Sequence, residues 1–527
     1  MRIGQDKLII LRKIVQSCSI AAVIAIIWNT RFPLDRFVNP SFYFHIDPLV
    51  MTTTAVAERV WLDGLALALA LLAATAFLGR FFCGWICPLG AALDFIALLK
   101  TPFARRRRTI EKNPSAARFT KYAVLAVIVI AAGAGRQFAW ALDPIAVFMR
   151  TFSLAVHPGV NNGLNGFFSG ILMRADIPGL ESVYNLLRDS FLGTDIAALS
   201  NTRGIVLLFA AIAVPVILKR RLWCRYLCPL GAMLALPALL SPLRRKASCG
   251  KKCRACMHSC RMNAIYSDNS YRREECILCF DCVRDCPDDS TRFAFSPVPK
   301  RKNVRSGIDS GKPLAVSRSA FLRYSAAAAL AVSVPLNAKK ALKAAVKQVR
   351  AILRPPGSLD GEEFIRRCIR CGNCMKICPT GVLVPSPLKL GLDRLWAPVL
   401  DTSSSYCEYT CNLCGKVCPT GAIRSLTPGK KAGAVIGLAV IDTEVCVPYK
   451  KGIDCLVCEE HCPVPEKAIV IKKTRFKGKY VKMPVVREDL CIGCGICEVK
   501  CPTEPEKAIK VFAPKMKAAL KQEKQNR

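Results

Sequence analysis

The chain has 527 residues, 29 of them cysteine, and a formal net charge of +39 at pH 7. This length exceeds that of one ordinary domain, so two or three units are expected. The cysteines lie in groups with gaps of two or three residues and are combined with long apolar runs, which excludes a small disulfide-bonded scaffold and indicates metal ligands.

The basic charge is not accompanied by a recognised nucleic-acid motif or an aromatic-interleaved basic face, so nucleic acid is not an expected partner. Iron–sulfur clusters and thiolates carry negative charge, and an anionic membrane surface attracts lysine and arginine. We therefore interpret the charge as compensation for such clusters and as attachment to a membrane.

Four apolar segments are predicted to cross a bilayer as helices, because each approaches 20 residues with its flanks. They are residues 14–28, 62–78, 122–140 and 204–218. Basic residues precede the first segment, fill the loop before the third and follow the fourth, which puts them on one side of a four-span topology. Because loops rich in lysine and arginine stay in the cytoplasm, this distribution predicts a multi-pass protein of the bacterial inner membrane with a cytoplasmic N-terminus. Buried helices of a soluble protein are the alternative.

These segments form an internal repeat within the predicted membrane domain, residues 1–240. The first half contains HIDPLV, a span and RFFCGWICPLGAAL, and the second contains ALDPIAV, a span and RLWCRYLCPLGAML. Duplicated helical hairpins usually pack about a pseudo-two-fold axis. The repeat therefore predicts that both CPLG segments lie at the cytoplasmic face and both Asp-Pro pairs at the outer face.

Each half carries one C-x3-C pair, which a helix would place on one face. The four residues are Cys83, Cys87, Cys224 and Cys228. The symmetry axis could bring them together as an additional metal or redox site. The alternative is that they are small buried residues at helix starts.

Four side chains at the predicted outer face are candidates for accepting protons from a quinol, because an imidazole or a carboxylate at the membrane interface can do so. They are His45, Asp47, Asp143 and His157. For the two Asp-Pro pairs, helix capping is the simpler interpretation.

The remaining chain is predicted to contain α+β ferredoxin domains. Residues 241–299 form a cytoplasmic two-cluster domain, 300–353 a basic linker with a possible fifth span at 318–336, 354–513 a four-cluster domain and 514–527 a basic tail. The possible fifth span would carry the four-cluster domain to the periplasm.

Six cysteine quartets are candidate ligands for about six [4Fe–4S] clusters, because three cysteines two residues apart can hold one cubane while the fourth ligates a neighbouring cluster. Three quartets follow C-x2-C-x2-C-x3-C-P: Cys276, Cys279, Cys282 and Cys286; Cys368, Cys371, Cys374 and Cys378; Cys491, Cys494, Cys497 and Cys501. Three are variants: Cys249, Cys253, Cys256 and Cys260; Cys407, Cys411, Cys414 and Cys418; Cys446, Cys455, Cys458 and Cys462. Zinc is the alternative metal, above all for the quartet that begins at Cys249.

Because the fourth cysteine of one quartet ligates the cluster of the neighbouring quartet, the ligands of the first two clusters can be assigned. One cluster takes the first three cysteines of the quartet at Cys249 together with Cys286, and the other takes those of the quartet at Cys276 together with Cys260. For the four C-terminal quartets the gaps are nearly equal, so neighbouring and nested pairing both stay open.

Residues 1–300 resemble the NapH-type membrane subunit of quinol dehydrogenases, on the four spans, the two C-x3-C-P motifs and two ferredoxin quartets. Residues from about 315 resemble NapG/MauM-type ferredoxins, on SRSAFLR, RCIRCGNCMKICPTGVL and YCEYTCNLCGKVCPTGAI. The resemblance implies a fusion that oxidises quinol of the membrane quinone pool and passes electrons to a redox partner, such as a periplasmic reductase or cytochrome. A metal-reducing maturation factor and a non-catalytic relay subunit are the alternatives.

Overall fold

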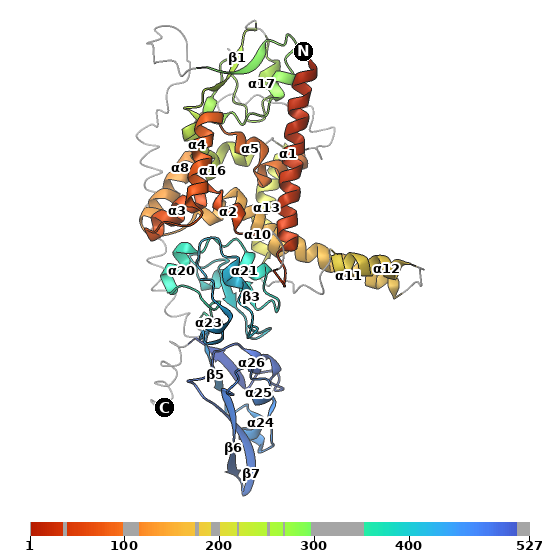
Figure 1. The fold of residues 1–527 in the computed structure, drawn as a ribbon, viewed down its shortest axis with the longest axis vertical. Coiled ribbons are helices and arrows are strands. Elements are labelled where there is room, and N and C mark those ends of the chain that lie inside the picture. The colour runs from red at the N-terminus through yellow and green to blue at the C-terminus, as the bar shows by residue number, and fades with distance from the viewer. Residues whose placement is uncertain are drawn as a thin grey trace. The chain divides into compact units, whose positions relative to one another are not determined.

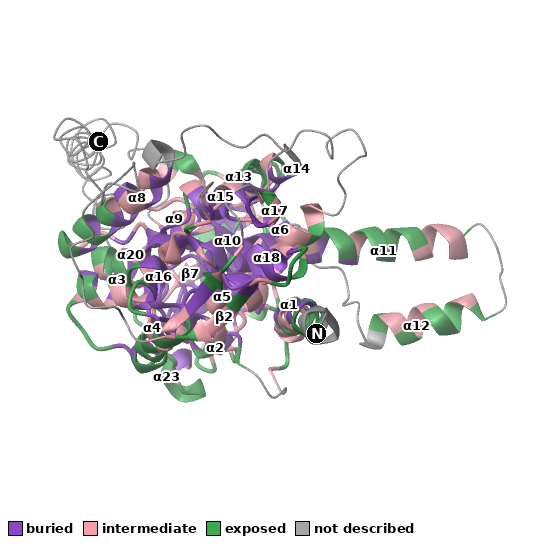
Figure 2. Ribbon diagram, turned by 90° about the horizontal axis from the view of Figure 1, so that it is seen from above, coloured by how far each residue is buried: buried purple, intermediate pink, exposed green. Residues whose placement is uncertain are grey.

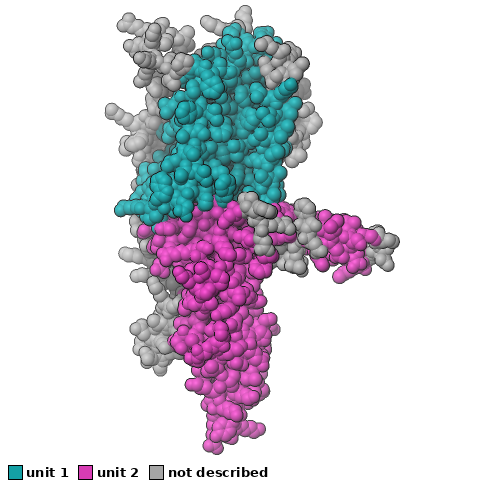
Figure 3. Space-filling model, viewed as in Figure 1, with its two compact units in different colours: residues 1–27, 42–151, 203–336 teal, residues 28–41, 152–202, 337–527 magenta. Residues whose placement is uncertain are grey.

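The structure is a computed structural model that describes residues 2–34, 39–97, 115–173, 179–190, 201–218, 221–249, 253–266, 269–296 and 352–513. Its contacts divide the chain into two compact units (Figure 3). Unit 1 contains residues 1–27, 42–151 and 203–336, and unit 2 contains residues 28–41, 152–202 and 337–527. The possible fifth span at 318–336 and the basic tail at 514–527 lie outside the described residues.

Unit 1 is a bundle of helices joined to a small ferredoxin-like part (Figure 1). Its helices are α1 (Arg2–Asn29, whose last two residues belong to unit 2), α2 (Phe42–His45), α3 (Pro48–Glu58), α4 (Leu65–Leu78), α5 (Phe81–Trp85), α6 (Pro88–Ile96), α8 (Ser115–Gly133), α9 (Ala139–Leu142), α10 (Pro144–Thr151), α13 (Arg203–Ala213), α14 (Pro215–Leu218), α15 (Leu222–Tyr226) and α16 (Pro229–Ala238). Helix α10 is buried along its whole length (Figure 2).

The ferredoxin-like part of unit 1 follows α16. It consists of β1 (Leu243–Ala247), α17 (Ala255–Ser259), η3 (Arg273–Glu275), α18 (Asp281–Arg284) and β2 (Thr291–Phe295). Strands β1 and β2 pair antiparallel, from Leu243 opposite Phe295 to Ala247 opposite Thr291. The pairing brings the two ends of the cysteine-containing segment together.

Among the described residues one helix, α1, is long and apolar enough to cross a membrane, through residues Lys7–Asn29. The other three predicted spans are shorter or interrupted. Gly79, with φ of 79°, ends α4 after 14 residues, Gly135, with φ of 73°, follows the end of α8, and Pro215 separates α13 from α14. The prediction of four continuous spans therefore overestimated these helices, because hydropathy does not register helix-breaking residues.

Unit 2 contains the segments 28–41 and 152–202, which lie between predicted spans in the sequence, and it also contains the C-terminal ferredoxin-like region. Its elements are η2, a π-helix (Phe152–Val156), α11 (His157–Leu172), α12 (Leu180–Ser190), α20 (Gly361–Arg367), α21 (Asn373–Lys376), β3 (Leu383–Pro385), η5 (Leu388–Leu390), β4 (Pro398–Leu400), α22 (Leu413–Lys416), α23 (Pro428–Ala432), β5 (Leu438–Ile441), α24 (Val447–Lys451), α25 (Val457–Glu460), β6 (Ile469–Phe476), β7 (Lys479–Val486), α26 (Ile496–Lys500) and β8 (Ile509–Phe512). The strands pair antiparallel as β3 with β4, β5 with β8 and β6 with β7. Helices and two-stranded ribbons of this kind give the α+β character predicted for ferredoxin domains.

Candidate metal centres

Five cavities in the described part of the chain are each lined by four cysteines. In every case three cysteines come from one quartet and the fourth is the last cysteine of another. The sets are Cys276, Cys279, Cys282 and Cys260; Cys368, Cys371, Cys374 and Cys418; Cys407, Cys411, Cys414 and Cys378; Cys446, Cys455, Cys458 and Cys501; Cys491, Cys494, Cys497 and Cys462. The exchange of the fourth ligand that the spacing predicts is therefore visible in the fold.

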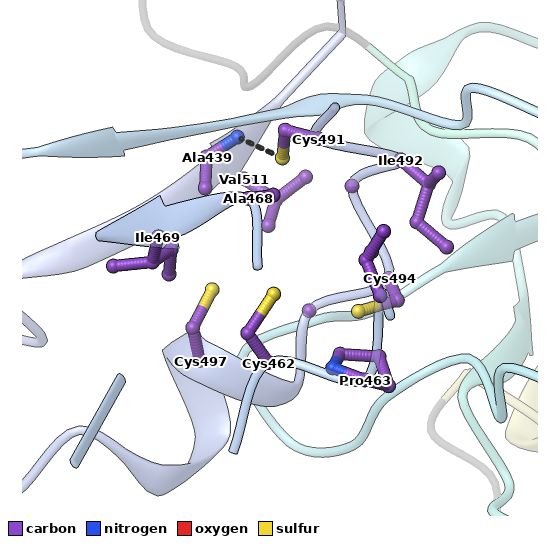
Figure 4. Close-up of a pocket in the computed structure, with 13 residues that line it drawn as sticks. Ala439, Cys462, Pro463, Ala468, Ile469, Cys491, Ile492, Cys494, Cys497 and Val511 are labelled. Carbon is purple, nitrogen blue, oxygen red and sulfur yellow. Dashed lines mark hydrogen bonds between the residues drawn. The ribbon is translucent and has the colours of Figure 1, made fainter. Parts of the chain in front are cut away.

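The cavity at Cys491 shows the arrangement (Figure 4). The sulfur atoms of Cys462, Cys491, Cys494 and Cys497 face one space between α26 and the strands. The backbone N–H of Ala439 donates a hydrogen bond to Cys491 Sγ at 3.5 Å. Apolar side chains complete the wall, so water is largely excluded from the sulfur atoms.

The C-terminal quartets exchange their fourth cysteine with the next quartet along the chain, which resolves the choice that the sequence left open. Cys378 and Cys418 exchange within one pair, and Cys462 and Cys501 exchange within the other. Nested pairing is absent from these cavities. The C-terminal ferredoxin-like region is therefore built as two consecutive modules, each with two four-cysteine cavities.

Polar side chains contact sulfur atoms of the sixth predicted set, which combines the first three cysteines of the quartet at Cys249 with Cys286. Asn269 Nδ2 donates to Cys249 Sγ at 3.2 Å, and an Arg245 guanidinium nitrogen donates to Cys256 Sγ at 3.0 Å. The side-chain oxygen of Asn269 lies 3.9 Å from Cys256 Sγ, so one asparagine contacts two cysteines of the set.

The cavities suit a cluster better than a single ion. Within the described chain, no group of three or more His, Cys, Asp or Glu side chains is close enough to hold one metal ion. Backbone N–H groups also donate to sulfur, from Ala264 to Cys260 at 3.2 Å and from Ile423 to Cys418 at 3.4 Å, as is usual where thiolates hold iron–sulfur clusters.

Burial disfavours the deprotonated, anionic form of these thiols unless a cation is present. Burial raises the pKa of Cys276 to about 12 and that of Cys279 to about 11. Coordination by a metal deprotonates a thiol regardless of such a shift. The donor sets are therefore consistent with clusters whose iron ions supply the missing positive charge.

The C-x3-C cysteines of the two halves lie together in unit 1. All four are buried, and their thiols are one another's electrostatic neighbours. Cys87 caps α6, with its sulfur accepting from the Gly90 N–H at 3.4 Å, and Cys228 caps α16 in the same way at 3.2 Å from Gly231. Both interpretations of the motif thus have a physical basis, because the cysteines start helices and also converge.

Two buried arginines cross between the halves at this four-cysteine site. Arg221, from the second half, donates to the backbone oxygen of Cys83 at 2.8 Å and to that of Gly90 at 3.1 Å. Arg80, from the first half, approaches Gly231 so closely that a Cβ there would lie 2.8 Å from its guanidinium. Burial raises the pKa of Cys224, whereas Arg221 and Arg80 lower it. Sequence reasoning missed these arginines, although both halves place Arg three residues before the first cysteine.

The four-cysteine site touches the loop of the neighbouring cluster cavity. A Cβ on Gly84 would lie 2.0 Å from the Ile277 carbonyl oxygen, so the two backbones are in direct contact. Trp85 Nε1 donates to the Leu278 carbonyl oxygen at 3.0 Å. In the second half, the residue equivalent to Gly84 is Arg225. Only the first half can therefore accept the ferredoxin loop at this point.

Buried ion pairs hold the helices of unit 1 to its ferredoxin-like part. Glu275 lies 2.5 Å from Lys121 and 3.5 Å from Arg80, and Asp281 lies 3.5 Å from Arg12. Lys121 and Arg12 are almost completely buried. The charge rule treats such residues as flanks of membrane spans, but their side chains also bind the ferredoxin-like part.

The two Asp-Pro carboxylates come together. Asp47 Oδ1 accepts from the Leu49 N–H at 3.0 Å as the N-cap of α3, and Asp143 Oδ2 accepts from the Ala146 N–H at 2.7 Å at the start of α10. Both are fully buried, and their other oxygens have no hydrogen-bond donor among the described groups. Burial raises the pKa of both carboxyl groups, and the neighbouring charge of Asp143 raises that of Asp47 further. Two neighbouring buried carboxyl groups disfavour the doubly ionised state.

The two candidate histidines belong to different units. His45 packs against Gly64 in unit 1. In unit 2, His157 packs edge-on against Trp28, and its Nδ1 lies 3.0 Å from Lys376 Nζ. Burial and Lys376 lower the pKa of His157 to about 3, so its imidazole is neutral at pH 7.

Repeated cysteine cavities with exchanged ligands define the class: this is an iron–sulfur electron-transfer protein of the ferredoxin type. Family profiles agree. One profile described as a 4Fe-4S binding domain matches residues 60–110 and 200–247, and a second profile of that description matches 484–505. A 4Fe-4S dicluster domain matches 367–422, and NosR matches 247–295.

Curated relatives then identify the family. The chain is 34% identical to the methylamine utilization ferredoxin-type protein MauM of Paracoccus denitrificans over 210 residues, 38% of this chain and 84% of the relative. It is 35% identical to the ferredoxin-type protein NapG of Escherichia coli over 189 residues, 35% of this chain and 78% of the relative. It is also 28% identical to the regulatory protein NosR of Pseudomonas aeruginosa, over 38% of this chain and 23% of that protein. The chain belongs to the NapG/MauM family of ferredoxin-type proteins. No solved structure matches it.

Proposed function

We propose that this chain is a fusion of a NapH-type membrane part and a NapG/MauM-type ferredoxin that oxidises quinol and passes the electrons to a redox partner. Six quartets would hold six [4Fe–4S] clusters, which supply one-electron redox chemistry when bound. The match of residues 60–110 and 200–247 to a 4Fe-4S binding domain supports a further redox site at the C-x3-C cysteines. The buried carboxyl pair, Asp47 and Asp143, is the observation that carries the quinol proposal.

Exposed apolar side chains support a membrane position for unit 1. Leu11 on α1, Phe77 on α4, Ile130 on α8 and Leu207 on α13 are between 48% and 69% exposed. Soluble proteins rarely expose large apolar patches, so we place all four helices in contact with lipid. Helix α4, at about 21 Å, is too short to cross a ~30 Å hydrocarbon core alone, and the adjoining α3 or α5 would complete that crossing.

The composition of unit 2 supports a periplasmic position for the C-terminal ferredoxin modules. With a cytoplasmic N-terminus, the segments 28–41 and 152–202 are the outer loops of the predicted topology. Both contact the ferredoxin modules within unit 2: Asn39 donates to the Lys416 carbonyl oxygen at 2.9 Å, and Leu154 packs against Gly372. The modules would then lie on the side of the outer loops, and the segment 318–336 would cross the membrane.

The carboxyl pair explains how protons leave the quinol. Oxidation of one quinol to quinone releases two protons and two electrons, and the electrons must be taken one at a time by the iron–sulfur acceptors. Two neighbouring carboxyls in an apolar site are costly, and a pair that holds one proton can accept another. The Tyr43 hydroxyl donates to the Ile86 carbonyl oxygen at 3.2 Å, beside Cys87, and it has Asp47 and Asp143 as electrostatic neighbours. This places a polar group between the pair and the four-cysteine site.

The test uses the full chain, purified without air in detergent and containing about 24 irons if six cubanes are present. A water-soluble quinol should bleach the iron–sulfur absorbance. Asp47→Asn and Asp143→Asn should each slow this reduction by about 10²- to 10⁴-fold without changing iron content, whereas Asp63→Asn, at an exposed aspartate of the same unit, should have no effect.

The pH dependence gives a second readout. Because burial raises the pKa of both carboxyls, lowering the pH protonates the carboxylate that would accept the quinol proton. The wild-type rate should therefore decrease as the pH is lowered. The two asparagine variants should lose that dependence. Unchanged rates in both variants would return these residues to helix capping. If dithionite reduces the wild-type protein but quinol does not, the chain is a relay subunit.

A further inference from the structure

The β6–β7 hairpin carries an unusual concentration of one charge. It pairs from Ile469 opposite Val486 to Phe476 opposite Lys479 and projects beyond α24, α25 and α26 (Figure 1). Between residues 469 and 486 there is no acidic residue. The basic residues are Lys472, Lys473, Arg475, Lys477, Lys479 and Lys482.

These cations are not neutralised by ion pairs within the described chain. None of the six forms an ion pair with another described residue, and all but the half-buried Lys482 are exposed. Lys473 lies directly opposite Lys482 on the partner strand, an arrangement that destabilises a sheet. Lysines also protect an exposed hairpin edge from pairing with other chains, but charges of either sign serve that purpose and need not face each other.

The hairpin adjoins one of the cysteine cavities. Pro484 of β7 lines the cavity of Cys446, Cys455, Cys458 and Cys501. Tyr449, which follows Cys446 on α24, donates its hydroxyl to the Pro484 carbonyl oxygen at 3.0 Å. The Lys482 N–H donates to Asp454 Oδ1 at 2.8 Å, next to Cys455. A protein bound to the hairpin would therefore lie beside a redox site.

We propose that the β6–β7 hairpin is the docking surface for an acidic electron-carrier protein, which exchanges single electrons with the site of Cys446, Cys455, Cys458 and Cys501. One electron passes between that iron–sulfur site and the cofactor of the carrier, and no bond is made or broken. The inference rests on the electron-transfer class of the chain and not on quinol oxidation. Charge complementarity of this kind mainly raises the rate of association and selects the partner.

The probe is cytochrome c in two forms that share one cofactor, the native basic protein and its succinylated acidic derivative. Binding to the full chain in phosphatidylcholine nanodiscs is measured by surface plasmon resonance, which does not depend on quinol or on electron flow. The acidic form should bind at least about tenfold more tightly than the basic form at low salt. The preference should largely disappear near 1 M salt, where charges more than ~3 Å apart are screened.

Two variants with the same change in net charge separate the hairpin from the general basicity of the chain. Lys473→Glu with Lys479→Glu should weaken binding of the acidic form about tenfold or more. Lys389→Glu with Lys430→Glu, at exposed positions on η5 and α23, should weaken it no more than about twofold. The hairpin variant should fold, because the carboxylate introduced by Lys473→Glu would face Lys482 as an opposite-charge pair.

Three results would overturn the proposal. The first is equal loss in the two double variants, which would mean that net charge alone attracts the probe. The second is an absence of preference for the acidic form. The third is a hairpin effect that appears only when phosphatidylglycerol is added to the nanodiscs, which would make an anionic lipid surface the partner.

Discussion

Gly84→Ala tests whether the four-cysteine site and the ferredoxin loop are in direct contact. The new Cβ would lie 2.0 Å from the Ile277 carbonyl oxygen, whereas ordinary contacts begin near 3.4 Å. The loop must therefore move by about 1.4 Å. That movement would also stretch the 3.0 Å hydrogen bond between Trp85 and the Leu278 carbonyl oxygen.

The expected cost follows from these two effects. Overpacking of a close contact costs about 1–3 kcal/mol, and loss of the hydrogen bond adds about 1 kcal/mol. A total of about 2–4 kcal/mol raises the population in which the segment 241–296 is detached by about thirtyfold to several hundredfold. Native-state proteolysis of the full chain measures this population, because cleavage follows the open state when opening and closing are fast.

Arg225→Ala is the matched control, since Arg225 occupies the position equivalent to Gly84 in the second half. This variant changes the equivalent position of the repeat, whereas the backbone contact to the Ile277 loop is made at Gly84. A much smaller change in proteolysis is therefore expected. If Gly84→Ala leaves the cleavage rate of segment 241–296 within about twofold of the wild type, the contact is not close in the molecule and the argument fails.

The exchange of fourth ligands and the buried ion pairs give two further predictions. Cys501→Ser should expose the other thiols of the cavity at Cys446 to alkylation, mapped by mass spectrometry, whereas Cys462→Ser should leave that cavity protected; the reverse pattern would exclude the exchanged pairing. Glu275→Gln should destabilise unit 1 by about 3–5 kcal/mol, because Lys121 would be left as a buried unpaired cation, and adding Lys121→Met should recover most of the loss in thermal unfolding. Equal stability of the single and double variants would show that the pair is not the source of the effect.

The cysteine loops could be predicted from the sequence because their geometry is local. Three cysteines two residues apart wrap one site whatever the rest of the chain does. The partner of each quartet is a long-range property, and the near-equal gaps between the C-terminal quartets carry no information about it. The fold resolves it through β5 and β8, which bring residues before Cys446 and after Cys501 together.

The membrane part was harder to predict, because hydropathy and charge are averages over many residues. A window of apolar residues does not register that Gly79 and Pro215 end helices. The rule that basic residues flank spans on the cytoplasmic side treats Arg12 and Lys121 only as such flanks. Both are nevertheless buried against acidic residues of the ferredoxin-like part. Neither pairing is visible in the sequence, since each joins residues far apart in the chain.

The internal repeat of residues 1–240 explains how the carboxyl pair and the four-cysteine site arise. Two halves that both begin helices with Asp-Pro and Cys-Pro create one site at each end, a shared carboxyl pair and a four-cysteine cluster, by the same symmetry. Symmetry alone would leave both halves equally able to bind a ferredoxin loop. The exchange of Gly84 for Arg225 removes that equivalence, because only a residue without a Cβ admits the Ile277 carbonyl oxygen at this distance. Gly84 therefore permits the close backbone contact with the first ferredoxin-like part that the side chain of Arg225 would obstruct at the equivalent position.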